Sequence, residues 1–464
     1  MDIPLLKKHI TYLIIPFTYQ KPFKTIPAIP FFTVKKLTNE KVFDHIASLI
    51  NHNENDKTTI GKAFELEPND RSKLGLPEQA ACRITYQVKE HTFEIRIDGI
   101  DLYLFDTQVG FLVYHIMTCG QKSEVDFEKQ VTIHDLILTN YYIKQVFKKT
   151  NKMYFIKDTN GKMTIDFKDL TKTVTKTLAV DSYFEEMNQN PNHVLLYTGS
   201  YLQGPVLSDG KDIAKYLYYL RKAYKDTYLP TKYDLNLEDN PDIYQPFENS
   251  YWGFSIEGVA NLSLETGNRT TDDYFADHFF NNIEKTYFYL YLLLLQQKYS
   301  LLKMSVNAGV IHNTLDGKNF SEQVNIINHF KQEIVDFTVR GLYEQVSYIT
   351  HHAELYEKIK NRLGIDSLYK ELKSELDALS SFIEVAADKD EKAKEEMRIE
   401  SREKTNILIQ VITLLFLPIT AITGFFGMNV DFLKGKDEYF YYSAIILYVV
   451  AFFGFYIIRK NNRR

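Results

Sequence analysis

The sequence predicts an α/β domain, then long stalk helices, then a two-helix transmembrane hairpin at the C-terminus, in a symmetric oligomer. Three observations support this fold class. Short alternating strand patterns extend to about residue 267. A helical, charge-rich pattern covers residues 268–404. Two stretches, 405–426 and 439–458, contain no charged residue. At 464 residues the chain is long enough for two or more units.

Composition excludes several classes of function. The chain is 45% hydrophobic and 25% charged, which is typical of a folded protein. A formal net charge of -5, without zinc-finger spacing or a basic zipper, gives no reason to expect nucleic acid as a partner. Cys82 and Cys119 form no CxxC pair, so we expect reduced thiols. With neither a glycine-rich phosphate loop nor a GxSxG turn in the sequence, no enzyme is predicted.

The first 267 residues predict a cytosolic α/β domain. Apolar and polar residues alternate in several short runs, as half-buried strands require. Asn160-Gly161, between alternating flanks at 153–167, predicts a hairpin turn. The expected strands are 93–97, 102–105 and 109–115 around a turn at 106–108, then 193–197 and 252–256, with helices at 42–50 and 213–224.

Residues 268–404 predict a cytosolic helical region and stalk. Helices are expected at about 273–304, 321–362 and from 367 onward, and the apolar run 286–295 is too short to cross a membrane. Gly364 ends the second helix, and Asp366 is expected to cap the next. A stripe of apolar residues follows on that helix at spacings of four and three: Leu368, Leu372, Leu376, Leu379 and Ile383.

No stop signal interrupts the last of these helices before the membrane. A continuous helix over 367–426 would be roughly 90 Å long and would need neighbours to lean on, which favours a symmetric oligomer. We expect the pair His351-His352 to lie on the solvated surface of its helix rather than to bind metal.

The two uncharged stretches predict transmembrane helices. Each is long enough to cross a hydrocarbon core of roughly 30 Å. Residues 427–438 form the external connector, and 459–464 are a basic tail. Positive residues flank the outer ends of the hairpin, which places both termini in the cytoplasm of a multi-pass protein of the inner (plasma) membrane.

The first span carries polar residues, whereas the second has few beyond tyrosines and one serine. Asn406, Gln410, Thr413, Thr420 and Thr423 lie in the first span, so it is the candidate pore helix. A simple anchor whose polar residues bind neighbouring helices explains the same composition equally well.

A motif at the outer end of the first span favours the pore helix over the simple anchor. Phe426 precedes Gly427-Met428-Asn429, Pro418 lies inside the helix, and the basic tail follows the second span. Over residues 405–430 the chain resembles the CorA family of magnesium and cobalt channels. That resemblance implies a homopentamer that transports Mg²⁺, with Co²⁺ or Ni²⁺ as further cargo, and that closes when internal Mg²⁺ binds carboxylates between subunits. It also implies an external selectivity filter of Gly427, Met428 and Asn429.

The chemistry of Mg²⁺ suits these residues. Mg²⁺ gives up its water reluctantly, and a ring of neutral oxygens can bond that water without removing it. Asn429 would supply the side-chain oxygen, so it is the predicted metal-binding residue, and Pro418 is the structural residue of the pore helix. We expect Asn406, Thr413 and Leu417 to line the pore, with Leu417 in an apolar constriction.

The sequence departs from the family in places, and other functions stay open. In a gapless register Glu403 stands where the family has a pore-lining asparagine. The alternatives are a zinc transporter of the same superfamily, although neither the pore helix nor the connector contains Cys or His, and a membrane-anchored cytosolic module that conducts nothing. The expected partners are further copies of the chain, membrane lipid and divalent cations.

Overall fold

The computed structural model describes two compact units. Its described residues are 3–26, 28–35, 59–74, 76, 82–85, 92–119, 130–145, 155–156, 167–183, 194–204, 210–315, 317–427 and 437–461. The first unit, here the sheet unit, comprises Met1–Asp316 and Ile326–Asp377. The second, here the C-terminal unit, comprises Gly317–Asn325 and Ala378–Arg464.

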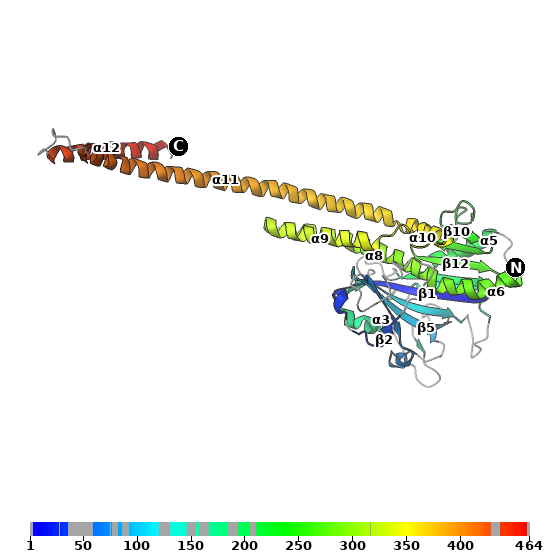
Figure 1. Ribbon diagram of the computed structural model, residues 1–464. Helices are drawn as coiled ribbons and strands as arrows, with labels where there is room; N and C mark the ends of the chain where they lie inside the picture. The colour runs from blue at the N-terminus through cyan, green and yellow to red at the C-terminus, as the bar shows by residue number, and fades with distance from the viewer. Residues whose placement is uncertain are drawn as a thin grey trace. The chain divides into compact units, whose positions relative to one another are not determined.

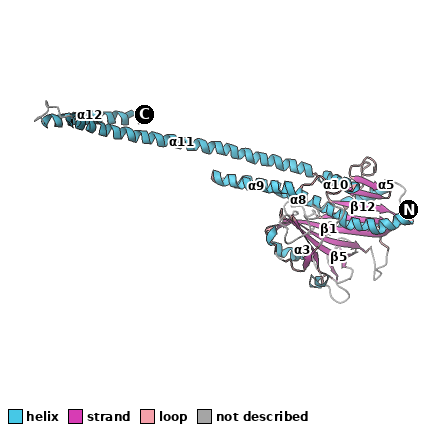
Figure 2. Cartoon of the chain, in the orientation of Figure 1, coloured by secondary structure: helices cyan, strands magenta, loops and turns pink. Residues whose placement is uncertain are grey.

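The sheet unit is built on one twelve-stranded sheet (Figures 1 and 2). Its main path runs β10-β11-β12-β9-β1-β6-β5-β3-β2, with β4, β7 and β8 attached to this path. Among the described strands, every pair is antiparallel except β9 with β12. The strands are β1 (Leu6–Tyr19), β2 (Phe32–Val34), β3 (Gly61–Leu66), β4 (Cys82–Thr85), β5 (Thr92–Phe105), β6 (Val109–Thr118), β7 (Phe155–Ile156), β8 (Val180–Tyr183), β9 (Leu195–Leu202), β10 (Ile243–Phe247), β11 (Ser250–Phe254) and β12 (Gly258–Leu264).

Helices connect and follow these strands. The short ones are η1 (Phe23–Thr25), η2 (Pro68–Asp70), η3 (Ser72–Leu74), η4 (Lys176–Leu178), α6 (Arg269–Tyr274), α7 (Phe280–Asn282) and the π-helical turns η5 (Phe275–Phe279) and η6 (Ile283–Tyr287). The longer ones are α2 (Ile133–Ile143), α3 (Phe167–Thr175), α5 (Gly210–Lys222), α8 (Phe288–Leu315), α9 (Phe320–Gly341), α10 (Thr350–Leu363), α11 (Ile365–Gly427) and α12 (Asp437–Asn461).

Both faces of the sheet are covered, because side chains on a strand alternate between them. On β1, Leu13 joins an apolar cluster with Leu170 of α3, whereas the neighbouring Tyr12 stacks edge-on against Phe288 of α8 at 4.6 Å. Helices α2 and α5 pack with β12 in a second cluster. The predicted mixed α/β character of this region is therefore confirmed.

Several predicted elements are found close to their expected places. Strands β5 and β6 meet at the turn 106–108, with Leu104 paired to Gly110. The apolar run 286–295 is buried, as expected, at the junction of η6 and α8. Helix α11 continues for 63 residues through Pro418 without a break, so the continuous helix predicted from 367 onward is confirmed.

The predicted single helix 321–362 is wrong, because the chain breaks between α9 and α10. Gly341 is the last residue of α9, and glycine has a low helix propensity. Val346, in the segment that connects α9 to α10, is fully buried. The Ser347 hydroxyl accepts a hydrogen bond from the Ile349 amide at 3.2 Å, which competes with a helical bond.

Two smaller predictions are also wrong. Asp366 does not cap α11: the helix begins at Ile365, after Gly364 in the left-handed conformation (φ 69°), and Asp366 is ion-paired with Lys360 at 2.9 Å. The pair His351-His352 is not a solvated pair, because His352 is 1% exposed and packs edge-on against Tyr287. The predicted helix 42–50 and the turn Asn160-Gly161 lie outside the described residues.

Candidate functional site

The candidate site lies on the second half of α11, within the C-terminal unit. From residue 367 to 417 the sequence contains neither glycine nor proline, and it is rich in Ala, Glu, Lys and Leu, which are good helix formers. Pro418 lacks an N–H and removes the bond to the Leu414 carbonyl, yet the helix continues to Gly427.

One face of this helix forms a stripe that we call the polar stripe. Its members follow one another at alternating intervals of four and three, which returns to the same face because the helix has about 3.6 residues per turn. All are exposed in the single chain. They are Asn406, Gln410, Thr413, Leu417, Thr420 and Gly424.

The polar stripe contains all three residues that were predicted to line a pore. Asn406, Thr413 and Leu417 share this face, and Leu417, 62% exposed, is its one large apolar member. The same spacing rule, applied to the sequence, would also have selected Gln410 and Thr420, which the prediction left out of the pore wall.

Two of the hydroxyl groups in this part of α11 are bonded to the backbone. The Thr420 hydroxyl donates to the Phe416 carbonyl at 2.6 Å, and the Thr405 hydroxyl donates to the Ser401 carbonyl at 2.9 Å. Each oxygen keeps lone pairs, so Thr420 can still accept a hydrogen bond from water on the exposed face.

Helix α12 packs against another face of α11 (Figure 1). A Cβ placed on Gly454 would come within 3.3 Å of Leu414 Cδ1, so the small residue allows close approach. Val411 and Leu414 are half-buried, whereas Leu417 remains exposed. The hairpin therefore leaves the polar stripe uncovered.

Apolar side chains are also exposed over the rest of the hairpin. Large ones on α11 and α12 have more than half of their surface exposed, among them Leu408, Phe416, Ile446, Phe452 and Phe453. An exposed apolar surface of this kind marks a contact with a partner or with lipid.

Part of the predicted site is not described by the structure. Gly427 is the last residue of α11, and Met428 and Asn429 lie outside the described residues. Among the residues that the structure describes, no helix combines the length and the apolar composition needed to cross a membrane. The spans 405–426 and 439–458 stay predictions of the sequence.

Two acidic side chains of the sheet unit form hydrogen bonds or ion pairs with neighbours in the same chain. The Asp272 carboxylate accepts hydrogen bonds from the Thr266 amide at 2.8 Å and from the Gly267 amide at 3.0 Å. Asp277 pairs with Lys8 at 3.0 Å. Both therefore have structural partners. Within the described part of the chain, no cluster of three or more His, Cys, Asp or Glu side chains is arranged to hold a metal ion.

Comparison with known families gives the stripe its context. No curated protein is significantly similar to the chain. Residues 300–460 match the family described as CorA-like Mg²⁺ transporter protein, and this region includes α11, α12 and the whole polar stripe. That family consists of membrane channels and transporters rather than enzymes. This match assigns residues 300–460 of the chain to the CorA-like Mg²⁺ transporter family.

Proposed function

We propose that the chain is a channel for divalent cations, with Mg²⁺ as its main cargo and Co²⁺ or Ni²⁺ as further cargo. The observation that carries the proposal is the polar stripe. It is an uncovered row of amide and hydroxyl groups on the part of α11, residues 405–426, whose other side chains are mostly apolar, within the region that matches the CorA-like family.

A polar row on an otherwise apolar helix needs several copies. In a bilayer, one helix hairpin cannot shield polar groups from lipid, whereas a ring of hairpins can turn them toward a shared aqueous axis. A symmetric homo-oligomer places Asn406, Gln410, Thr413 and Thr420 along that axis and leaves the apolar side chains to lipid. The resemblance to the family favours five subunits.

The proposed filter is Gly427, Met428 and Asn429 at the outer end of α11. Amide and carbonyl oxygens there accept hydrogen bonds from the water around Mg²⁺, so the ion enters without losing its tightly held shell. Leu417 lies deeper and would form an apolar ring that blocks ions when it is dry.

Internal Mg²⁺ would regulate the channel. The part of α11 that precedes the polar stripe, residues 388–404, is exposed and contains many carboxylates. Facing rows of acids on neighbouring subunits repel each other unless a divalent cation lies between them, so bound Mg²⁺ would hold a closed, symmetric arrangement.

The proposed orientation has both termini in the cytoplasm of an inner (plasma) membrane. Its basis is the basic tail after α12, which the positive-inside rule assigns to the cytoplasm. Lys436→Cys should react with an impermeant maleimide added outside intact cells, and Asn461→Cys should react only after permeabilisation. The reverse pattern would contradict this orientation.

Ion flux into proteoliposomes tests the function directly. Full-length protein should admit Mg²⁺ to a trapped fluorescent indicator, and Co²⁺ and Ni²⁺ should pass more slowly or block. Zn²⁺ entry without Mg²⁺ entry would support the zinc-transporting alternative. If protein that electron microscopy shows to be oligomeric gives no flux of any divalent cation, the result would support the alternative of a membrane-anchored module that conducts nothing.

A further inference from the structure

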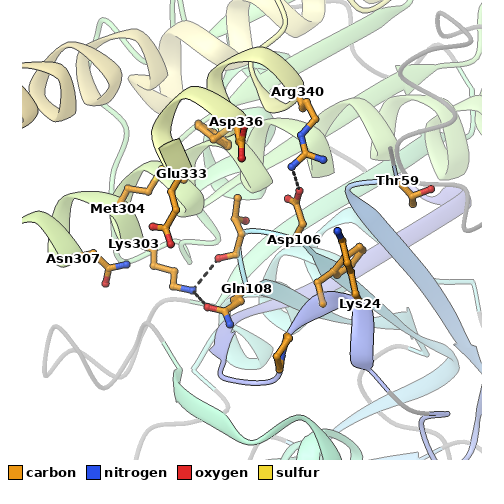
Figure 3. Close-up of a pocket in the computed structure, with 14 residues that line it drawn as sticks. Lys24, Thr59, Asp106, Gln108, Lys303, Met304, Asn307, Glu333, Asp336 and Arg340 are labelled. Carbon is orange, nitrogen blue, oxygen red and sulfur yellow. Dashed lines mark hydrogen bonds and ion pairs between the residues drawn. The ribbon is translucent and has the colours of Figure 1, made fainter. Parts of the chain in front are cut away.

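A cavity of about 430 Å³ lies in the sheet unit beside the turn between β5 and β6 (Figure 3). Its wall includes η1, the turn residues 106–108, one face of α8 and one face of α9. All of these segments belong to the sheet unit. The volume is within the range of small-molecule sites in proteins, so the cavity can hold a small organic ligand.

Contacts within the chain fix the wall of this cavity. Lys303 of α8 donates hydrogen bonds to the Thr107 carbonyl at 2.9 Å and to Gln108 Oε1 at 3.0 Å. Asp106, the first residue of the turn, forms an ion pair of 2.9 Å with Arg340 of α9. The turn is thereby joined to both helices, and the cavity exists before any ligand enters.

Charges of both signs line the cavity in equal number. The Asp106–Arg340 ion pair is neutral as a unit. Besides that pair, the charged residues of the described wall are two lysines and two acids: Lys24, Lys303, Glu333 and Asp336. A ligand with a net charge of one sign would match only half of these groups, whereas a ligand with both signs can match them all.

Groups of each sign are available to a ligand. Lys24 of η1 is exposed, and within the described part of the chain no carboxylate forms an ion pair with it. Glu333 and Asp336 lie one turn apart on α9 and are exposed. Their partners are on the same helix: Glu333 pairs with His329 at 3.3 Å, and Asp336 accepts a hydrogen bond from Gln332 at 2.9 Å. Each carboxylate keeps lone pairs that can accept a further hydrogen bond.

Apolar surface and a buried hydroxyl complete the wall. Phe23, Met304 and Phe337 are buried side chains that line the cavity. Thr59 also lines it, and its buried hydroxyl has no hydrogen-bond partner among the residues that the structure describes. A buried polar group without a partner costs free energy. A ligand with an apolar part and a polar end would cover the rings and could supply that partner.

We propose that this cavity binds a zwitterionic α-amino acid with an apolar side chain. In the view of Figure 3, Lys24 lies to the right of Asp106, and Glu333 and Asp336 lie to its left. The ligand carboxylate faces Lys24, its ammonium faces the two acids of α9, and its side chain lies against the aromatic rings. A phosphate ester would instead bring negative charge toward those acids. This site does not depend on the proposed transport function.

Isothermal titration calorimetry of the purified full-length protein, in detergent at neutral pH, tests the site with L-leucine, L-methionine and L-phenylalanine. Leucine should bind saturably, with one molecule per chain. Isocaproate, which is leucine without the ammonium, and isopentylamine, which is leucine without the carboxylate, should each bind about tenfold more weakly. Three results would each overturn the proposal: no saturable binding of any of the three amino acids, binding of adenosine monophosphate in their place, or isopentylamine binding as tightly as leucine.

Two variants assign the two charges of the ligand. Lys24→Met should weaken leucine binding about tenfold and leave isopentylamine binding unchanged, because the amine has no carboxylate. Asp336→Asn should weaken leucine and isopentylamine binding and leave isocaproate binding unchanged. Lys232→Met, at an exposed lysine of the same unit that does not line the cavity, is the control and should bind leucine like the parent.

The pairing of variant and ligand separates a binding role from a folding role. A variant that merely distorted the cavity would weaken all three ligands together, and that result would contradict the assignment of the charges. An equal loss of leucine binding in Lys24→Met and Lys232→Met would place Lys24 outside the site.

Discussion

The sheet unit and the C-terminal unit treat polar groups in opposite ways. In the sheet unit the Arg221 side chain is fully buried, yet it is paired with Asp234 at 3.1 Å and with Asp242 at 3.2 Å. In the C-terminal unit the polar stripe is exposed, as is Leu417 within it. The first unit satisfies its charges within one chain. We infer that the second completes its surface only with other copies of the chain and with lipid.

The largest expected effect is at the proposed filter. Asn429→Ala removes a side-chain oxygen that would bond the water around the ion. A hydrogen bond to a charged group contributes about 1.5–3 kcal/mol, so Mg²⁺ uptake should fall roughly 10- to 150-fold. Uptake is measured by indicator fluorescence in proteoliposomes, and oligomer size by gel filtration. Normal uptake by a correctly assembled variant would remove Asn429 from the filter.

A loss of comparable size is expected at the buried charges of the sheet unit. Arg221→Met removes the buried cation between Asp234 and Asp242. Because Asp234 keeps its ion pair with Lys222 and Asp242 keeps its ion pair with Arg362, each at 3.1 Å, the loss should cost about 1.5–3 kcal/mol of unfolding free energy. Urea unfolding followed by fluorescence reports on this unit, because the single tryptophan, Trp252, is fully buried in β11.

Lys225→Met is the matched control for Arg221→Met. Lys225 contributes only a cation–π contact with Tyr141, at 5.1 Å, so its loss should cost about 1 kcal/mol or less. Equal effects of the two substitutions would show that the buried network adds nothing beyond ordinary surface charge.

The comparison also shows what the sequence can and cannot predict. Periodicity located α11 and the turn 106–108, because both depend on residues close together in the chain. Arg221 and His352 are buried because they contact partners from distant segments of the chain, such as Asp242 and Tyr287. Without knowledge of such partners, a charged or ionisable residue in a sequence is expected to be exposed. The break between α9 and α10 was missed because Gly341 is a weak signal without the buried Val346 that follows it.

For the site, the sequence predicted more than the described structure can test. Asn406, Thr413 and Leu417 lie on one exposed face of α11, as their spacing requires, and their place in a pore wall stays a prediction. Their orientation toward an axis depends on copies of the chain, and the filter residues Met428 and Asn429 lie outside the described residues.

A smaller effect is expected at the apolar member of the polar stripe. Leu417→Asn would replace an apolar ring by one that holds water, so the closed channel should leak. At millimolar internal Mg²⁺, which should close the parent, flux should rise about threefold to tenfold. Leu408→Asn, off the stripe, is the control and should leave the closed state tight. Equal leaks in the two variants would place Leu417 outside the constriction.

The smallest effect is expected where the chain departs from its family. Glu403 continues the spacing of the polar stripe, three residues before Asn406, and is exposed. In a symmetric oligomer it would place one carboxylate per subunit at the inner end of the pore, and a ring of like charge concentrates cations near it. Glu403→Gln should therefore lower Mg²⁺ conductance roughly twofold to fivefold, and less at high salt, because mobile ions screen the ring.

Glu400→Gln is the matched control, since Glu400 lies off the stripe and is paired with Lys404 at 2.7 Å. Patch-clamp recordings at two ionic strengths separate the possibilities. A loss that salt does not reduce would assign Glu403 to direct ion binding, and equal losses in both variants would show that the stripe ends at Asn406.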